Sequence, residues 1–371
     1  MNLTKKRWII LIASCFINLC IGSIYAWSVF ASPMAEYLSA LTGTTFTAGT
    51  LAIVFTVTNS VGPITMITGG RINDKFGPKK VIFVGGLIFG IGMILAGYSK
   101  SLPMLILTYG VILGLGVGMV YGCTISNSIK FFPDKRGLVG GVTTAAYGLS
   151  SVIIPPIANS IINAFDVTMA FKSIGVAFLI IVCVSSFFIE KCPSNFVPEG
   201  WTPPANLDNK LNKNDKDWRE MLSSPIFYVM ITLLTCGAFY GLMCTSMAFI
   251  ISIVGLFCLA ISSQGDIVKF YIGISIVGVC FGAFMGVFPG FTVDQFGAKN
   301  NSVNYGIMFI GFAFAGYIAP TVMKNVYASY GDYKRAFIIG IVMALVGLGL
   351  TFVYRFVNNK DLVKKELKKI S

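Results

Sequence analysis

Apolar runs of twenty or more residues recur along nearly the whole of this 371-residue chain. A helix of about 20 apolar residues is long enough to cross the hydrocarbon core of a bilayer. Only 12% of the residues are charged, roughly half the share expected in a soluble domain. We therefore expect an all-α polytopic membrane protein. The composition argues against a soluble enzyme, a disordered regulator and a nucleic-acid-binding module.

The apolar runs also predict the domain organisation. The segment 225–263 is roughly twice as long as one crossing requires. The stretch 191–222 is rich in proline and charge, and we expect a cytoplasmic linker there. This divides the chain into an N-terminal six-span bundle (1–190), the linker, and an incomplete C-terminal bundle with a basic cytoplasmic tail (223–371). The predicted spans are 8–30, 47–68, 81–99, 102–128, 138–163, 168–189, 225–263, 267–291, 303–328 and 335–357.

The basic residues predict the orientation. When loops are assigned alternately to two sides, the side of the N-terminus holds all but six of the 28 Lys and Arg residues. Because cytoplasmic loops are enriched in Lys and Arg, both termini are expected in the cytoplasm, in a plasma or inner membrane. The net charge of +13 then reflects topology and contact with anionic lipids, so no nucleic-acid partner is expected. The six exceptions are Lys100, Lys172, Lys269, Lys324, Lys334 and Arg335.

The second half of the chain repeats the first. A glycine recurs every fourth residue in two spans, and the two series are separated by 164 positions. Gly22 in the first half is instead best matched with Gly241, 219 positions later. By Phe249 the offset between the two halves has dropped to 164 positions. About 55 residues, equivalent to 29–83, are therefore absent from the second half, which leaves about 10–11 spans in all. The matched glycines are Gly114 with Gly278, Gly118 with Gly282, and Gly122 with Gly286.

The loop between the second and third spans reads GRINDKFGPKK over residues 70–80. Gly77 permits a tight turn, and Asp74 can accept charge-assisted hydrogen bonds from helix N-termini. The loop resembles the cytoplasmic signature of the major facilitator superfamily, which implies two helical bundles that this loop helps to hold together on one face. The alternative is a generic basic loop. The loop residues expected to take part in gating are Gly70, Asp74, Lys75, Gly77, Lys79 and Lys80.

Three charged residues elsewhere are expected at the same cytoplasmic edge. Asp134 and Arg136 follow the fourth span, and Asp294 holds the corresponding place in the second half. We predict that they help to close an inner gate, with a solvated loop as the alternative.

Three stretches resemble the oxalate/formate antiporter family, whose members exchange or co-transport small carboxylates. They are GSIYAWSVF (22–30), the run 114–141 between the fourth and fifth spans, and Asn304-Tyr305-Gly306. Two departures disfavour oxalate. The span that carries an arginine in oxalate-carrying members falls in the missing segment, and Phe312 stands where those members carry a lysine.

Aromatic residues are the candidate substrate ligands. The resemblance implies that Tyr25, Tyr121 and Tyr147 line a central cavity, where a hydroxyl at membrane depth needs a partner such as a small anion. Helix packing is the alternative. Phe284 and Phe288 share one face of a span and could complete an aromatic cage with Phe312, although phenylalanine at this spacing is also typical of plain packing.

The sequence predicts secondary active transport of a small monocarboxylate, of the lactate or formate type, by alternating access. The chain has no histidine, and no Asp or Glu is evident inside the predicted spans. Exchange with a counter-anion, or a proton carried by the substrate, is therefore favoured. We expect a monomer surrounded by lipid, with no enzymatic activity, catalytic residue, cofactor or metal site. The rival interpretations are a transport-inactive or receptor-like truncated paralogue and an incomplete gene model.

Overall fold

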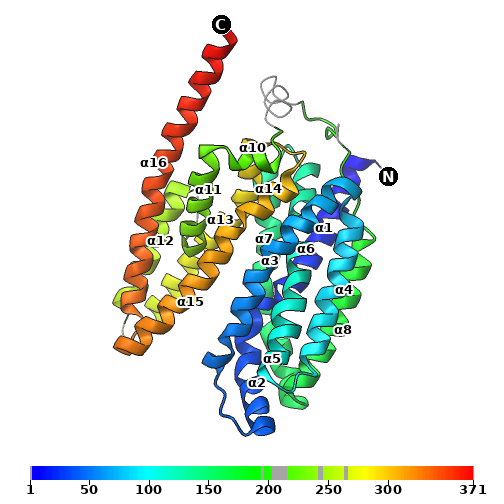
Figure 1. Ribbon diagram of the computed structural model, residues 1–371, viewed down its shortest axis with the longest axis vertical. Coiled ribbons are helices and arrows are strands. Elements are labelled where there is room, and N and C mark those ends of the chain that lie inside the picture. Colours follow the sequence, from blue (N-terminus) through cyan, green and yellow to red (C-terminus); the bar gives the residue numbers. More distant parts are fainter. Residues whose placement is uncertain (1, 194–195, 203–214, 241–244, 263–265, 371) are drawn as a thin grey trace. The chain divides into compact units, whose positions relative to one another are not determined.

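The described part of the chain is almost entirely helical in the computed structural model (Figure 1). Within it, nine helical stretches are long and apolar enough to cross a membrane, and two shorter apolar helices accompany them. The all-α, multi-span fold that the sequence predicts is therefore confirmed. The described residues are 2–193, 196–202, 215–240, 245–262 and 266–370.

The helices group into two compact units. Unit 1 contains residues 1–215 together with 292–307, and unit 2 contains 216–291 and 308–371. The predicted domain boundaries near residues 190 and 222 remain predictions.

Unit 1 contains the six spans of the N-terminal half. The first span consists of α1, the 3₁₀ segment η1 and α2. The fourth consists of α5, the π-helical segment η2 and α6. In chain order the elements are α1 (Leu3–Ile21), η1 (Gly22–Ala26), α2 (Trp27–Thr42), α3 (Ala48–Phe76), α4 (Pro78–Ala96), α5 (Leu102–Leu105), η2 (Ile106–Leu113), α6 (Gly114–Phe131), α7 (Arg136–Ala164) and α8 (Val167–Ser186).

The remaining helices follow the linker. The long apolar run 225–263 contains two helices, α11 and α12, and residues 241–244 between them lie outside the described part. Gly241, where the repeat offset changes, is one of these four residues. The helices are α10 (Trp218–Leu222), α11 (Pro225–Tyr240), α12 (Thr245–Ile261), α13 (Ile267–Phe296), α14 (Asn301–Met308), α15 (Ile310–Tyr330) and α16 (Lys334–Ile370).

Local sequence signals set the ends of α3. Thr47 and Thr50 form a reciprocal capping box at its N-terminus, which satisfies backbone donors that a helix start leaves unpaired. At its C-terminus Gly77 has a φ of 91°, a conformation that glycine tolerates best. Pro78 then occupies the first position of α4, where its missing N–H costs nothing. The loop motif is thus a sharp turn between two spans.

Glycines bring α6 into close contact with α3. A Cβ on Gly114 would lie 2.8 Å from the carbonyl oxygen of Thr58, and a Cβ on Gly118 would clash with the carbonyl of Gly62. Without the hydrophobic effect between them, helices in lipid associate through such close backbone packing. The glycine stripe of the fourth span is therefore a packing surface for the second span.

The corresponding glycines of α13 are different. A Cβ on Gly278 or Gly282 would meet no described atom of unit 2 within 4 Å. The partner of the first-half stripe is α3, and the predicted missing segment is the second-half equivalent of α3. Loss of that helix would leave the glycines of α13 without a close neighbour in unit 2, as observed for Gly278 and Gly282 among the described residues. The loss itself stays a prediction.

Candidate functional site

The three tyrosines predicted to line a cavity lie together in unit 1. The ring of Tyr147 on α7 lies 5.3 Å from that of Tyr25 on η1, nearly edge-on at 82°. It also lies 4.8 Å from the ring of Tyr121 on α6. We call Tyr25, Tyr121 and Tyr147 the tyrosine cluster. Aromatic pairs at these separations pack favourably against each other.

A glycine allows the cluster to form. A Cβ on Gly22 would clash with the backbone carbonyl of Tyr147 and lie 2.9 Å from the hydroxyl oxygen of Ser150. Gly22 also begins the 3₁₀ segment that interrupts the first span. The small residue therefore lets η1 approach α7 closely enough for Tyr25 to reach Tyr147.

A fourth tyrosine joins the cluster from far along the chain. Tyr305, on α14, is fully buried, and its hydroxyl interacts with that of Tyr121. Thr144 on α7 interacts with the Tyr121 hydroxyl as well. The cluster thus combines aromatic faces with neutral hydroxyls, which can both donate and accept hydrogen bonds.

The three phenylalanines predicted to complete the cage lie in unit 2. Phe284 and Phe288, both buried on α13, pack against each other with ring centroids 5.0 Å apart. Phe312 on α15 stacks on Phe309 at 4.5 Å and lies 6.3 Å from Phe281. The phenylalanines therefore form aromatic packing within unit 2, and their role as substrate ligands stays a prediction.

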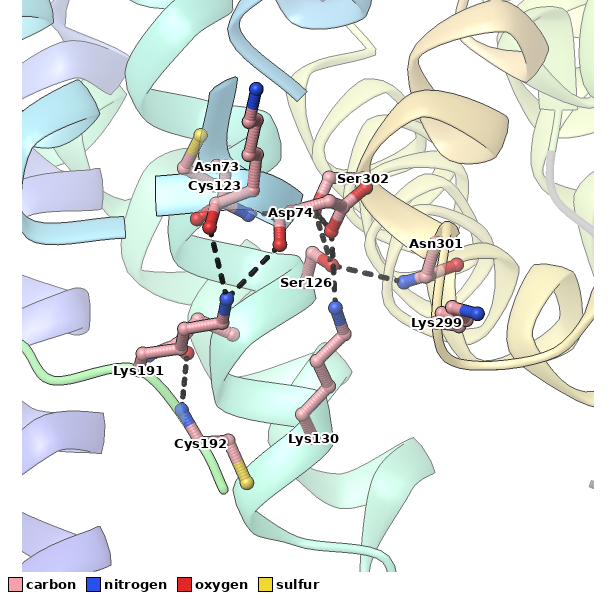
Figure 2. Close-up of polar contacts among 12 residues, drawn as sticks. Asn73, Asp74, Cys123, Ser126, Lys130, Lys191, Cys192, Lys299, Asn301 and Ser302 are labelled. Carbon is pink, nitrogen blue, oxygen red and sulfur yellow. Dashed lines mark hydrogen bonds and ion pairs between the residues drawn. The ribbon is translucent and has the colours of Figure 1, made fainter. Parts of the chain in front are cut away.

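A polar cluster lies at the C-terminal end of α3 (Figure 2). The Asp74 carboxylate accepts hydrogen bonds from the hydroxyl of Ser302 at 2.9 Å and from the ammonium of Lys130 at 3.1 Å. The backbone N–H of Val303 donates to it as well. Asp74 therefore lies at the start of α14, where a helix dipole favours negative charge. This is the type of contact that the sequence led us to expect for Asp74.

Uncharged side chains extend this polar cluster. Ser302 Oγ accepts from Asn73 Nδ2 at 2.7 Å and lies 2.9 Å from the hydroxyl of Ser126. Ser126 in turn accepts from Asn301 Nδ2 at 3.3 Å. We call Asn73, Asp74, Ser126, Lys130, Asn301 and Ser302 the Asp74 cluster. It joins α3 and α6 to the beginning of α14.

Gly70 and Lys191 support the same contact. A Cβ on Gly70 would lie 2.8 Å from the backbone carbonyl of Ser302, so only glycine permits α14 to approach α3 here. Lys191 Nζ donates to the carbonyl oxygens of Asp74 at 3.0 Å and Lys75 at 3.4 Å (Figure 2). A cation at this position complements the negative end of the α3 dipole.

The three lysines of the loop motif have surroundings different from those of Asp74. Lys75, Lys79 and Lys80 are exposed. The ammonium groups of Lys75 and Lys79 lie 5.2 Å and 5.0 Å from the rings of Phe76 and Phe187. This arrangement is typical of cations that extend toward a lipid surface.

The remaining predicted gate residues form two ion pairs. Arg136 pairs with Asp294 at 2.8 Å, so these two come together as expected at one edge. Asp134 pairs instead with Arg7, through two hydrogen bonds of 2.7 Å and 3.1 Å. The Arg7 guanidinium lies 4.5 Å from the ring of Phe132. Asp134 thus joins the start of α1 to the loop after α6.

Comparison with known proteins explains the loop motif. The family model of the Major Facilitator Superfamily matches residues 8–250, which is more than half of the chain. The chain belongs to the major facilitator superfamily.

Two relatives match over most of the chain, and a third matches over less than half of it. The Oxalate:formate antiporter of Oxalobacter formigenes is 27% identical and covers 97% of this chain and 78% of its own length. The uncharacterized MFS-type transporter YhjX of Escherichia coli (strain K12) is 24% identical, and the match covers 84% of this chain and 86% of the length of YhjX. Human Monocarboxylate transporter 12 is 28% identical over 46% of this chain and 31% of its own length.

A solved structure shares the fold. The proton:xylose symporter XylE superposes with a TM-score of 0.67 at 11% sequence identity, over 96% of this chain and 97% of its own. At this identity the likeness concerns the fold alone. It supports the facilitator architecture of the chain.

Sequence reasoning missed several residues of this facilitator's candidate site. Ser302 and Ser126 were not among the predicted site residues because a serine in a helix has no distinctive sequence signal, and Arg7 was counted only as a topology signal. Tyr305 lies in the Asn304-Tyr305-Gly306 motif, so a signal for it was present. In the described part of the chain, no three Cys, Asp or Glu side chains gather as a metal site would require.

Proposed function

We propose that this protein is a secondary transporter of small monocarboxylates, of the lactate or formate type. The observation that carries the proposal is the tyrosine cluster, which offers hydroxyl groups from three spans and no formal cation. Within residues 8–42, 102–129 and 137–164, which contain these spans, there is no Lys or Arg. The names of the antiporter and the monocarboxylate transporter among its relatives support a carboxylate substrate.

The charge balance favours a monoanion over a dianion. Transfer of an ionised carboxylate into a poorly hydrated site is costly unless hydrogen bonds or opposite charges compensate it. Neutral hydroxyls can compensate one negative charge far better than two. Phe312, at the position where a lysine is expected in oxalate carriers, also favours a monoanion as the substrate.

Transport would proceed by alternating access around this site. The Asp74 cluster and the Arg136–Asp294 ion pair would close the cytoplasmic side and open when the substrate is released there. The substrate would exchange with a counter-anion or carry its own proton. We propose a monomer in the inner or plasma membrane with both termini in the cytoplasm.

One observation favours a second candidate. A Cβ on Gly278 or Gly282 would meet no atom within 4 Å among the described residues of unit 2, whereas the first-half counterparts pack on α3. A chain that lacks one cavity-lining helix could be a transport-inactive or receptor-like paralogue, or the product of an incomplete gene model. This candidate predicts no flux but leaves ligand binding open.

A ligand-dependent thermal unfolding assay tests the substrate class. A ligand that binds only the folded state stabilises it, by about 2.7 kcal/mol at a hundred times its dissociation constant. We expect lactate and formate to raise the Tm of the purified protein more than oxalate does, and neutral lactamide to leave it unchanged. An unchanged Tm with all three carboxylates would contradict the proposal.

A further inference from the structure

We propose that the indole N–H of Trp27 and the hydroxyl of Tyr109 form a second hydrogen-bonding subsite, next to the tyrosine cluster, that receives a carboxylate oxygen of the substrate. This inference rests on the proposed function. Neither residue belongs to the tyrosine cluster.

Both side chains are buried, and both carry a polar atom without a partner. Trp27 is 6% exposed and Tyr109 is 0% exposed. Among the described residues, neither Trp27 Nε1 nor the Tyr109 hydroxyl has a hydrogen-bond partner. Most buried polar groups in folded proteins are hydrogen-bonded, so an orphaned pair calls for an explanation. An indole N–H can only donate, so what is missing at Trp27 is an acceptor.

The two groups belong to one aromatic layer. The rings of Trp27 and Tyr109 lie 4.7 Å apart. Phe171 packs edge-on against Tyr109 at 5.8 Å and stacks on Phe30 at 4.5 Å. These apolar walls lower the local dielectric, which strengthens any hydrogen bond that a ligand makes there.

The subsite adjoins the tyrosine cluster. Trp27 packs on Tyr109 with ring centroids 4.7 Å apart, and Tyr109 lies close enough to Tyr147 of the cluster for the two side chains to interact. A carboxylate held by the cluster therefore has a second set of neutral donors nearby.

The backbone at Tyr109 is unusual in a way that suits a binding role. Tyr109 lies within the π-helical segment Ile106–Leu113, and π-helical turns are rare and frequent at functional sites. Its carbonyl oxygen accepts a hydrogen bond from the Thr58 hydroxyl at 3.3 Å. The backbone is thus held by α3, and only the side-chain hydroxyl is left for a ligand.

The acceptor could come from a carboxylate or from a water molecule, and one experiment separates them. Purified protein is titrated with lactate, and lactamide at the same concentrations serves as the neutral control. The dissociation constant is measured for wild type, Tyr109→Phe and Trp27→Phe. Tyr98→Phe is the matched control, because Tyr98 is an exposed tyrosine that packs under Lys172. The ¹⁵N-indole resonance of Trp27, assigned by its loss in Trp27→Phe, reports on the N–H directly.

We expect Tyr109→Phe to weaken lactate binding about fivefold or more and to leave the Tm of the ligand-free protein unchanged or raised. Lactate, but not lactamide, should shift the Trp27 indole resonance, and Tyr98→Phe should bind like wild type. If Trp27→Phe does not fold, Phe substitutions of the other three tryptophans assign the Trp27 resonance by elimination. The dissociation constant of Tyr109→Phe for lactate then still tests the subsite.

Two outcomes would overturn the inference. Wild-type affinity in Tyr109→Phe together with an unmoved indole resonance would mean that the pair holds water only, while the proposed function would stand. No binding of any carboxylate to the wild type would overturn the proposed function itself, and this subsite with it.

Discussion

The hydroxyl of Ser302 donates a hydrogen bond of 2.9 Å to the carboxylate of Asp74, across 228 positions of sequence. The same hydroxyl accepts from Asn73. One serine therefore connects the end of α3 to the start of α14. In a transporter that alternates between two open states, such a contact on one face can be made in one state and broken in the other.

Replacement of Ser302 by Ala should destabilise the protein. The substitution leaves the buried Asn73 amide without its acceptor and removes one donor from Asp74, a loss of about 1–3 kcal/mol. Thermal unfolding in detergent measures the effect. Ser160→Ala is the matched control, because Ser160 is exposed and, among the described residues, its hydroxyl bonds only to Pro156 O of its own helix. Equal Tm values for the two variants would contradict a structural role for the Asp74 cluster.

The two ion pairs of Asp134 and Asp294 should differ strongly in their contribution to stability. The Arg7 and Asp134 side chains are 8% and 12% exposed, whereas Asp294 is 57% exposed. Loss of one partner from a buried pair leaves an uncompensated charge and costs about 3–5 kcal/mol, while an exposed pair contributes up to about 1 kcal/mol. Asp134→Asn should therefore lower the Tm far more than Asp294→Asn. A larger fall in Tm for Asp294→Asn than for Asp134→Asn would show that burial does not determine how much each ion pair contributes to stability.

The glycine repeat gives a matched pair of substitutions. Gly118→Ala places a Cβ against the carbonyl of Gly62, so we expect misfolding or a large fall in Tm. Gly282→Ala, its counterpart, meets no described atom of unit 2 within 4 Å and should be tolerated. Circular dichroism melts of both variants test this. A severe defect in Gly282→Ala would indicate that a helix covers the second stripe after all.

Asp166 should make a pH-dependent contribution to stability. Its carboxylate accepts from the Thr168 hydroxyl at 2.7 Å and the Met169 N–H at 2.8 Å, at the start of α8. These hydrogen bonds, the Thr168 hydroxyl foremost, lower the pKa of Asp166.

The sign of this contribution follows from the lowered pKa. The stabilisation is complete above the unfolded-state pKa of about 3.9 and is lost as the pH falls through the lower folded-state value. Asp166→Ala should cost about 1 kcal/mol at neutral pH, and the difference in Tm from wild type should shrink at low pH. A difference in Tm between Asp166→Ala and wild type that stays constant down to pH 3 would contradict a stabilising role of the ionised Asp166 as the N-cap of α8.

The sequence predicted the elements of this fold better than their contacts. Apolar length alone located the spans, and the loop around Asp74 and Gly77 was recognisable by its residue types. The tyrosine cluster was predictable because Tyr25, Tyr121 and Tyr147 lie at mid-span in stretches that resemble one transporter family. The apolar run 225–263 is about twice as long as one crossing requires, and hydropathy alone left open whether it forms one helix or two.

Other contacts could not be predicted because tertiary packing creates them. Ser302 looks like an ordinary helix-start residue until α14 lies against α3. Arg7 serves as a topology signal in the sequence, but its partner is Asp134. The orphaned donors of Trp27 and Tyr109 are invisible in the sequence, since burial without a partner is a property of the folded chain.

Flux through reconstituted protein tests the central claim most directly. Proteoliposomes loaded with unlabelled lactate would be diluted into labelled lactate, and uptake compared with protein-free vesicles. The proposed function predicts accumulation that formate inhibits strongly and oxalate weakly, and that Tyr121→Phe reduces. No uptake of labelled lactate or formate above protein-free vesicles, with protein shown to be folded by its thermal transition, would contradict monocarboxylate transport.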